Sequence, residues 1–168
     1  MLKEGALAPN FELPGDDGHA HKLRSYRGRY VILYFYPKDL TPGCTTEACE
    51  FNDALAGIAD KNAVIFGVSK DSLASHARFK SKHHLNFPLL SDADLTVHEA
   101  YGAHGEKVMY GKKVKGTIRS TFLIDDKGHV AKVWSKVRVK GHVKSVLEAL
   151  QKQQGEIPLY QGKVTLRK

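Results

Sequence analysis

Two continuous apolar runs constrain the fold of this chain more than any other feature. Residues 30–36 read YVILYFY and residues 63–69 read AVIFGVS. Runs of β-branched and aromatic residues without alternation are typical of strands buried on both faces, as in the centre of a parallel sheet. Between them, residues 45–60 repeat apolar side chains at helical spacing. The sequence therefore predicts a β-α-β unit at the centre of the fold.

The rest of the chain supplies elements that surround this unit. Residues 11–13 and 19–23 flank a turn and predict an N-terminal β-hairpin. Residues 103–116 are rich in glycine and lysine with weak patterning, so we expect a loop there. Further helices are expected over 72–85, 95–101 and 142–151, and further strands over 87–90, 118–124 and 129–137. This order predicts an α/β fold with a central mixed β-sheet flanked by helices on both faces.

Composition indicates an ordinary globular chain. It has 168 residues, of which 42% are hydrophobic, enough to bury a core. The N-terminal residues lack the apolar region of a secretory signal, and no window approaches the roughly 18 apolar residues of a membrane span. We therefore expect a cytoplasmic protein without a membrane partner.

The net charge of +8 raises the possibility of a nucleic-acid-binding module. The basic residues are dispersed, however, and the densest run, residues 132–144, alternates with valines like one polar face of a strand. The histidines have no ligand spacing that joins them to the cysteines, and we expect them at the surface. Nucleic-acid binding is therefore the weaker alternative.

The only two cysteines, Cys44 and Cys49, follow a short loop that ends in Thr-Pro-Gly. In a reducing compartment, a close pair is more often catalytic, redox-active or metal-binding than structural. One pair cannot form a four-cysteine zinc site. The spacing C-x4-C differs from the C-x-x-C of disulfide oxidoreductases, but a protein thiol–disulfide oxidoreductase stays open as an alternative.

The loop around Cys44 suits a thiol nucleophile. Cys44 is expected where a helix begins, and there unpaired backbone N–H groups and the helix dipole favour a thiolate. Thr41 can offer a hydroxyl to the same space. Pro37 restricts the path of the loop, and Gly43 lets the backbone approach a ligand closely. Cys44 is therefore the candidate nucleophile.

The pattern Pro37-x-x-x-Thr41-x-x-Cys44, with Glu47 three residues on, resembles the active-site motif of peroxiredoxins. The fuller stretch FYPKDLTPGCTTEACEF is similar to the peroxiredoxin Q, or bacterioferritin comigratory protein, subfamily. The resemblance continues through FGVSKDSLASHARF, FPLLSD, GTIRSTFLID and VRVKGHV, and covers about residues 5–150.

The resemblance implies a thioredoxin-like fold and the reduction of hydrogen peroxide or organic hydroperoxides, with no metal or organic cofactor. It implies a peroxiredoxin domain over residues 1–154, with residues 155–168 as a C-terminal extension of unknown role. The expected partners are a peroxide and thioredoxin or a similar dithiol reductant. We expect a monomer or a weak homodimer.

The resemblance also assigns roles to single residues. Cys44 matches the peroxidatic cysteine, and Cys49 matches the resolving cysteine of many members of the subfamily, which closes a disulfide with it. The other matches are Thr41 with the threonine that hydrogen-bonds the peroxide, Pro37 with the proline that shields the pocket, Arg119 with the arginine beside the thiolate, and Glu47 with the glutamate that orders the site. Backbone N–H groups of Gly43 and Cys44 are expected to share in stabilising the developing charge.

The spacing of the two cysteines adds a conformational expectation. On one regular helix their Cα atoms would lie about 8.7 Å apart, on faces about 140° different. A disulfide tolerates about 7 Å at most between Cα atoms. The two thiols are therefore expected to join only if the helix between them unwinds.

Overall fold

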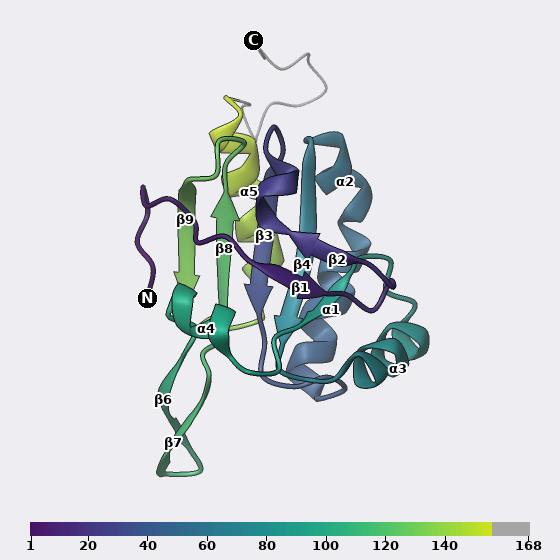
Figure 1. Ribbon diagram of the computed structural model, residues 1–168, viewed down its shortest axis with the longest axis vertical. Helices are drawn as coiled ribbons and strands as arrows, with labels where there is room; N and C mark the ends of the chain where they lie inside the picture. Colours follow the sequence, from purple (N-terminus) through teal and green to yellow (C-terminus); the bar gives the residue numbers. More distant parts are fainter. Residues whose placement is uncertain (156–168) are drawn as a thin grey trace.

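A five-stranded mixed sheet forms the centre of the computed structural model, which describes residues 1–155 (Figure 1). Its strands are β3 (Tyr30–Phe35), β4 (Ala63–Ser69), β5 (Leu89–Ser91), β8 (Ser120–Ile124) and β9 (Val130–Ser135). Their order is β5-β4-β3-β8-β9. Strands β3, β4 and β5 are parallel; β8 is antiparallel to β3, and β9 is antiparallel to β8. The predicted central mixed sheet is confirmed, and the predicted extension lies, apart from Gly155, outside the described residues.

The central strand β3 explains the first apolar run. It pairs with β4 from Tyr30↔Ala63 to Phe35↔Val68, and on its other edge with β8 from Val31↔Ile124 to Phe35↔Ser120. Helices cover both of its faces, so every residue after Tyr30 is buried. A strand in this position has no solvent face, and its sequence therefore cannot alternate.

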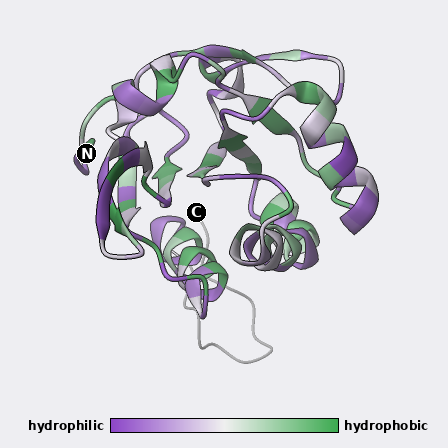
Figure 2. Cartoon of the chain, turned by 90° about the horizontal axis from the view of Figure 1, so that it is seen from below, coloured by the Kyte–Doolittle hydropathy of each residue, from purple (hydrophilic) through white to green (hydrophobic). Residues whose placement is uncertain are grey.

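Two layers of elements cover the sheet. One face packs against α1 (Pro42–Asp53), α2 (Leu55–Asp60), α3 (Leu73–His83) and α5 (His142–Gln153). The other packs against α4 (Thr96–Tyr101), the hairpin β1 (Glu12–Pro14)–β2 (Ala20–Lys22) and the 3-10 helix η1 (Leu23–Tyr26). Figure 2 shows hydrophobic residues on the strands between these layers and hydrophilic residues on outer helix surfaces. Within the described part of the chain, no helix combines the length and apolar character needed to cross a membrane.

Several predicted boundaries need correction. The helix expected over 45–60 begins earlier, at Pro42, and is broken at Ala54, whose N–H bonds to the carbonyl of Phe51 at 3.0 Å. Ile58 of α2 packs into the core. The polar run 132–144 is only partly strand, because β9 ends at Ser135.

The prediction of a loop over residues 103–116 is wrong. The structure places an antiparallel hairpin there, formed by β6 (His104–Met109) and β7 (Lys112–Thr117), which projects from the body of the protein (Figure 1). Most of its side chains are exposed or half-buried on both faces. A hairpin that buries neither face needs no apolar alternation, so its sequence carries no period-two signal.

Candidate active site

Cys44 lies at the start of α1, just beyond the carboxyl end of the central strand. Thr41 is the N-cap residue and Pro42 the first helical residue, so Cys44 is the third residue of the helix and is 2% exposed. The N–H of Thr45 bonds to the carbonyl of Thr41 at 2.8 Å. The N–H groups of Gly43 and Cys44 precede this bond and have no acceptor within the helix. The predicted helix-start position of Cys44 is confirmed.

Arg119 joins Cys44 to Glu47. Its Nη2 donates a hydrogen bond to Cys44 Sγ at 3.3 Å, and its Nη1 donates to Glu47 Oε1 at 2.6 Å. Arg119 directly precedes β8, whose first residue, Ser120, pairs with the end of β3. Glu47 follows Cys44 by three residues and so lies on the same side of α1. Gly43 borders the guanidinium too, because a side chain there would come within 3.4 Å of Nη2.

The charge of this cluster resides mainly on Arg119. Burial raises the pKa of Glu47 to about 7, against the lowering effect of Arg119. The second carboxylate oxygen of Glu47, Oε2, lies 4.0 Å from Nε2 of His142. The same His142 nitrogen lies 2.7 Å from Thr121 Oγ1. Burial, helped by the charge of Arg119, lowers the pKa of His142 to about 4, so its ring is neutral at ordinary pH. The cation in contact with the sulfur is therefore Arg119, and the Lys107 ammonium, which donates to the carbonyl of Thr117 at 3.0 Å, adds a second electrostatic interaction with Cys44.

Two further predicted site residues belong to the active-site loop, residues 36–41. Thr41 is half-buried, and its hydroxyl donates to the carbonyl of Lys38 at 2.8 Å. Pro37 lines a cavity of about 520 Å³ together with Arg119. Thr41 therefore belongs to the site as the N-cap residue of α1. Its hydroxyl donates its hydrogen bond within the active-site loop.

Cys49 lies on the same uninterrupted helix as Cys44, as predicted. Both are free thiols, Cys44 buried and Cys49 half-buried. Burial raises the pKa of Cys49, and the nearby charge of Asp53 adds to the effect. In this conformation Cys49 is a protonated thiol held away from Cys44.

The expectation that the histidines lie at the surface is wrong for four of the nine. The buried ones are His21, His76, His98 and His142. Each has a polar partner that removes the cost of burial. Asp17 bonds His21 and Asp92 bonds His98, at 2.9 and 2.7 Å. For His76 the partner is distant in sequence, and local pattern gives no sign of it.

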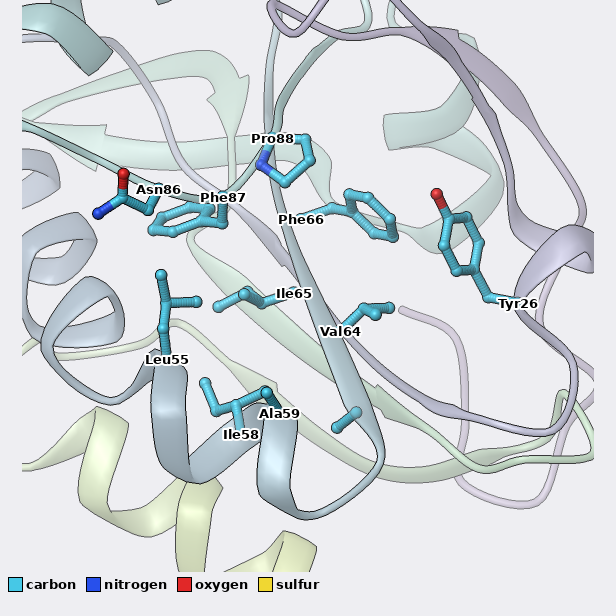
Figure 3. Close-up of a pocket in the computed structure, with 11 residues that line it drawn as sticks. Tyr26, Leu55, Ile58, Ala59, Val64, Ile65, Phe66, Asn86, Phe87 and Pro88 are labelled. Atoms are coloured by element: carbon cyan, nitrogen blue, oxygen red, sulfur yellow. The ribbon is translucent and has the colours of Figure 1, made fainter.

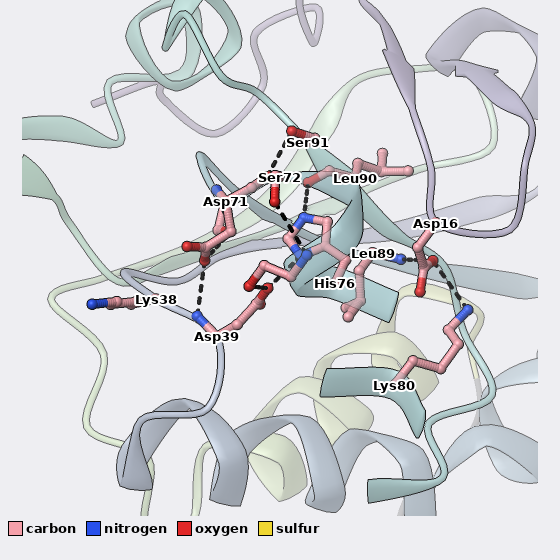
Figure 4. A network of polar contacts seen from close by, with 12 residues as sticks. Asp16, Lys38, Asp39, Asp71, Ser72, His76, Lys80, Leu89, Leu90 and Ser91 are labelled. Atoms are coloured by element: carbon pink, nitrogen blue, oxygen red, sulfur yellow. Dashed lines mark hydrogen bonds and ion pairs between the residues drawn. The ribbon is translucent and has the colours of Figure 1, made fainter. Parts of the chain in front are cut away.

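That partner is Asp39, a buried residue of the active-site loop (Figure 4). Asp39 Oδ1 accepts from the Tyr36 hydroxyl at 2.6 Å. Its Oδ2 accepts from Ser75 Oγ at 2.8 Å and from His76 Nδ1 at 2.7 Å. Both of these donors lie on α3, so the carboxylate joins the active-site loop to that helix.

The His76 ring is charged in this arrangement. Nδ1 faces the Asp39 carboxylate, and Nε2 faces the carbonyl of Leu90 at 3.0 Å. Because both oxygens only accept, both nitrogens must donate. Burial opposes the charge, but the bond and charge of Asp39 raise the pKa of His76 above its ordinary value. The ligand atoms of His76, Asp39 and Asp71 lie within 4.8 Å of one another. A charged imidazole ring, however, has no free lone pair with which to bind a metal ion.

A separate apolar cavity of about 220 Å³ lies at the edge of β4, beside the part of that strand that β5 does not cover (Figure 3). Ile58, Ile65 and Phe87 are among its lining residues. Among the described residues that line it there is no cysteine, histidine or carboxylate. Its polar lining side chains are Tyr26 and Asn86, and residues 1–155 supply no thiol for redox chemistry there.

A buried cysteine at a helix start, bonded to a guanidinium beside the central strand of a thioredoxin-like fold, defines the class of a cysteine-dependent redox enzyme. Comparison with known proteins agrees. The AhpC/TSA family matches residues 5–133. Peroxiredoxin Bcp of Bacillus subtilis (strain 168) is 50% identical over 149 residues, which cover 89% of this chain and 95% of that protein.

Solved structures give the same result. Peroxiredoxin Q of Xanthomonas campestris superposes with a TM-score of 0.83 at 43% identity, covering 90% of this chain and 96% of that one. The bacterioferritin comigratory protein of the same organism, studied for its alkyl peroxide reduction activity, has a TM-score of 0.83 at 42% identity, covering 91% and 98%. The chain belongs to the AhpC/TSA family. It is a thiol-dependent peroxidase, and its predicted resemblance to peroxiredoxins is confirmed.

Replacing His76 by Gln should destabilise the fold in a pH-dependent way, because Gln can keep one hydrogen bond but carries no charge. The raised pKa means that the charged pair contributes fully below the ordinary pKa of 6.5 and is lost as pH rises through the folded value. Urea unfolding should show a loss of about 1.5–3 kcal/mol at about pH 6 and a smaller loss at about pH 9.

The exposed His129 provides the matched control. His129→Gln should change the free energy of unfolding by less than about 0.5 kcal/mol at either pH. A loss in His76→Gln that stays constant with pH would contradict a charged His76.

Proposed function

We propose that the protein reduces hydrogen peroxide and organic hydroperoxides with Cys44 as the attacking thiolate. The observation that carries this proposal is the hydrogen bond of 3.3 Å from Arg119 Nη2 to Cys44 Sγ in a buried site. A fixed cation beside the sulfur stabilises the thiolate. The alkyl peroxide reduction activity of the Xanthomonas campestris relative supports organic hydroperoxides as substrates.

In the first step, the Cys44 thiolate attacks one peroxide oxygen. An S–O bond forms, the O–O bond breaks, and the departing oxygen takes a proton and leaves as water or an alcohol. Cys44 becomes a sulfenic acid. Arg119 and the N–H groups of Gly43 and Cys44 stabilise the negative charge on the departing oxygen.

The surrounding residues prepare this step. Glu47 holds the guanidinium through its bond of 2.6 Å. Pro37 shields the side of the cavity that it shares with Arg119. The Thr41 hydroxyl turns from the carbonyl of Lys38 to donate to the bound peroxide.

In the second step, the thiol of Cys49 condenses with the sulfenic acid at Cys44. A disulfide forms and water leaves. Thioredoxin or a similar dithiol then reduces this disulfide by thiol–disulfide exchange and is itself oxidised. We place the protein in the cytoplasm, because dithiol reductants are kept reduced there.

The two alternatives have less support. A protein disulfide is a bulky substrate, and Cys44, at 2% exposure, is closed to it while α1 is intact. The basic residues of the 132–144 run are divided between a strand, a connecting segment and a helix, so they do not form one continuous face for nucleic acid.

Mass spectrometry of three matched proteins tests the proposed function. With one equivalent of hydrogen peroxide, the wild type should lose two hydrogens and both free thiols. Cys49→Ser should gain one oxygen, and dimedone should trap the resulting sulfenic acid. Cys44→Ser should stay unchanged. Oxidation of Cys44→Ser at the wild-type rate would show that another group reacts with the peroxide.

Arg119→Ala should slow the oxidation of Cys44 by about 10²–10³-fold, because one preorganised charge-stabilising donor is lost. Arg119→Lys should be intermediate, since an ammonium keeps the charge but cannot bond the sulfur and Glu47 with one planar group. Stopped-flow measurement of peroxide oxidation gives these rates. Equal rates for Arg119→Ala and the wild type would remove Arg119 from the mechanism.

Closing the disulfide should unwind α1, because both cysteines lie on one intact helix. The unwinding gives up a few hydrogen bonds at about 1 kcal/mol each, which local opening can supply. Amide hydrogen exchange should therefore lose protection over residues 44–52 in the oxidised protein and keep it in β3 and β4. Equal protection of α1 in both forms is the contrary outcome.

A further inference from the structure

The projecting hairpin β6–β7 ends in three consecutive exposed apolar side chains. Val108 is 70% exposed, Met109 47% and Tyr110 97%. Scattered single apolar residues on a surface need no explanation. Three in a row, at the end of the element that projects farthest from the body in Figure 1, form an apolar tip.

The aromatic residue at the tip occupies an unfavourable backbone conformation. Tyr110 has φ 53° and Gly111 has φ 77°, the signs of a two-residue type I′ turn. Such turns favour Asn-Gly, because a bulky residue with positive φ is strained. At 97% exposure, Tyr110 gains no packing within the described part of the chain that offsets this strain.

Lysines surround the apolar tip. Lys112 pairs with Met109, and Lys113 pairs with Val108, so ammonium groups accompany the apolar residues on both faces of the hairpin. Lys115 is exposed two pairs further back, opposite Glu106, the hairpin's single acidic residue. The whole chain carries a net charge of +8.

We propose that this tip docks on an anionic lipid surface. Aromatic and apolar side chains favour the boundary between headgroups and acyl chains, where a tyrosine keeps its hydroxyl in the polar zone. Neighbouring lysines extend their ammonium groups to anionic headgroups. A tyrosine among lysines could also stack on an unpaired base, but the exposed Val108 and Met109 beside it have no partner on phosphates and fit the apolar side of a lipid interface.

The hairpin lies beside the active site. Lys107, Val108 and Met109 line the cavity of about 520 Å³ that Pro37 and Arg119 also line. Docking through the tip would hold the mouth of that cavity close to the headgroups. Vesicle binding requires no turnover. The docking proposal can therefore fail while the proposed peroxidase function holds, and the peroxidase function can fail while docking holds.

Vesicle flotation tests the proposal. The reduced full-length protein is mixed with phosphatidylcholine vesicles that contain roughly 30% phosphatidylglycerol, or none. The wild type should float with the anionic vesicles, weakly with neutral ones, and less at about 0.5 M salt. Tyr110→Ser and Lys112→Ser/Lys113→Ser should each weaken binding fivefold or more, and Tyr110→Trp should keep it.

Matched controls come from other surfaces. Leu7→Ser removes a side chain that is 57% exposed. Lys127→Ser/Lys152→Ser removes two exposed charges, one from the β8–β9 turn and one from the end of α5, which lie at the opposite end of the molecule from the hairpin (Figure 1). Both should bind like the wild type, and all variants should reduce hydrogen peroxide in solution at the wild-type rate. Absence of binding at low salt, or equal loss in hairpin and control variants, would overturn the proposal. So would competition by duplex DNA with a tip-dependent affinity higher than that for vesicles, or a tip-dependent dimer that does not bind vesicles.

Discussion

The guanidinium of Arg119 is the group on which the arrangement of the site depends. A largely buried cation needs anionic or strongly accepting partners, because its own solvation has been lost. Arg119 finds them in Glu47 Oε1 and Cys44 Sγ, at 2.6 and 3.3 Å. Two independent constraints make this possible: the pairing of β8 with β3 positions the arginine, and the three-residue spacing on α1 aligns the carboxylate with the thiol. A shift in either the strand register or the helix phase would separate the three groups.

A second buried ion pair fixes the loop that precedes the cysteine. Asp39 connects to His76 and Ser75 on α3, and its N–H donates to Asp71 Oδ2 at 2.8 Å. These bonds do not involve α1, whereas the bonds of Arg119 do. If α1 opens to bring the two cysteines together, the contacts of Arg119 must break while those of Asp39 can persist. The fold therefore offers a hinge at the N-cap of α1, with a fixed loop on one side and a helix that can open on the other.

Sequence reasoning succeeded where burial or chemistry leaves a local signature. The apolar runs of β3 and β4 follow from burial on both faces, and the predicted position of Cys44 at the start of a helix agrees with α1. It failed where the signature is not local. Asp39 and His76 are 37 residues apart, so no spacing rule connects them. The β6–β7 hairpin buries neither face and shows no alternation. Residues 45–60 keep one helical period across the break at Ala54, so the period does not reveal it.

The electrostatics of the site follow from what surrounds the arginine. Because burial raises the pKa of Glu47 to about 7, its carboxylate carries only part of a negative charge near neutral pH. His142 stays neutral, since burial and Arg119 lower its pKa to about 4. The positive charge of Arg119 is therefore not fully neutralised by its ion-pair partner. The remaining positive charge of Arg119 stabilises negative charge on the sulfur. Together with the free N–H groups at the start of α1, it also stabilises any negative charge that forms beside the sulfur. A fully ionised partner would hold the arginine more tightly but would reduce the field at Cys44.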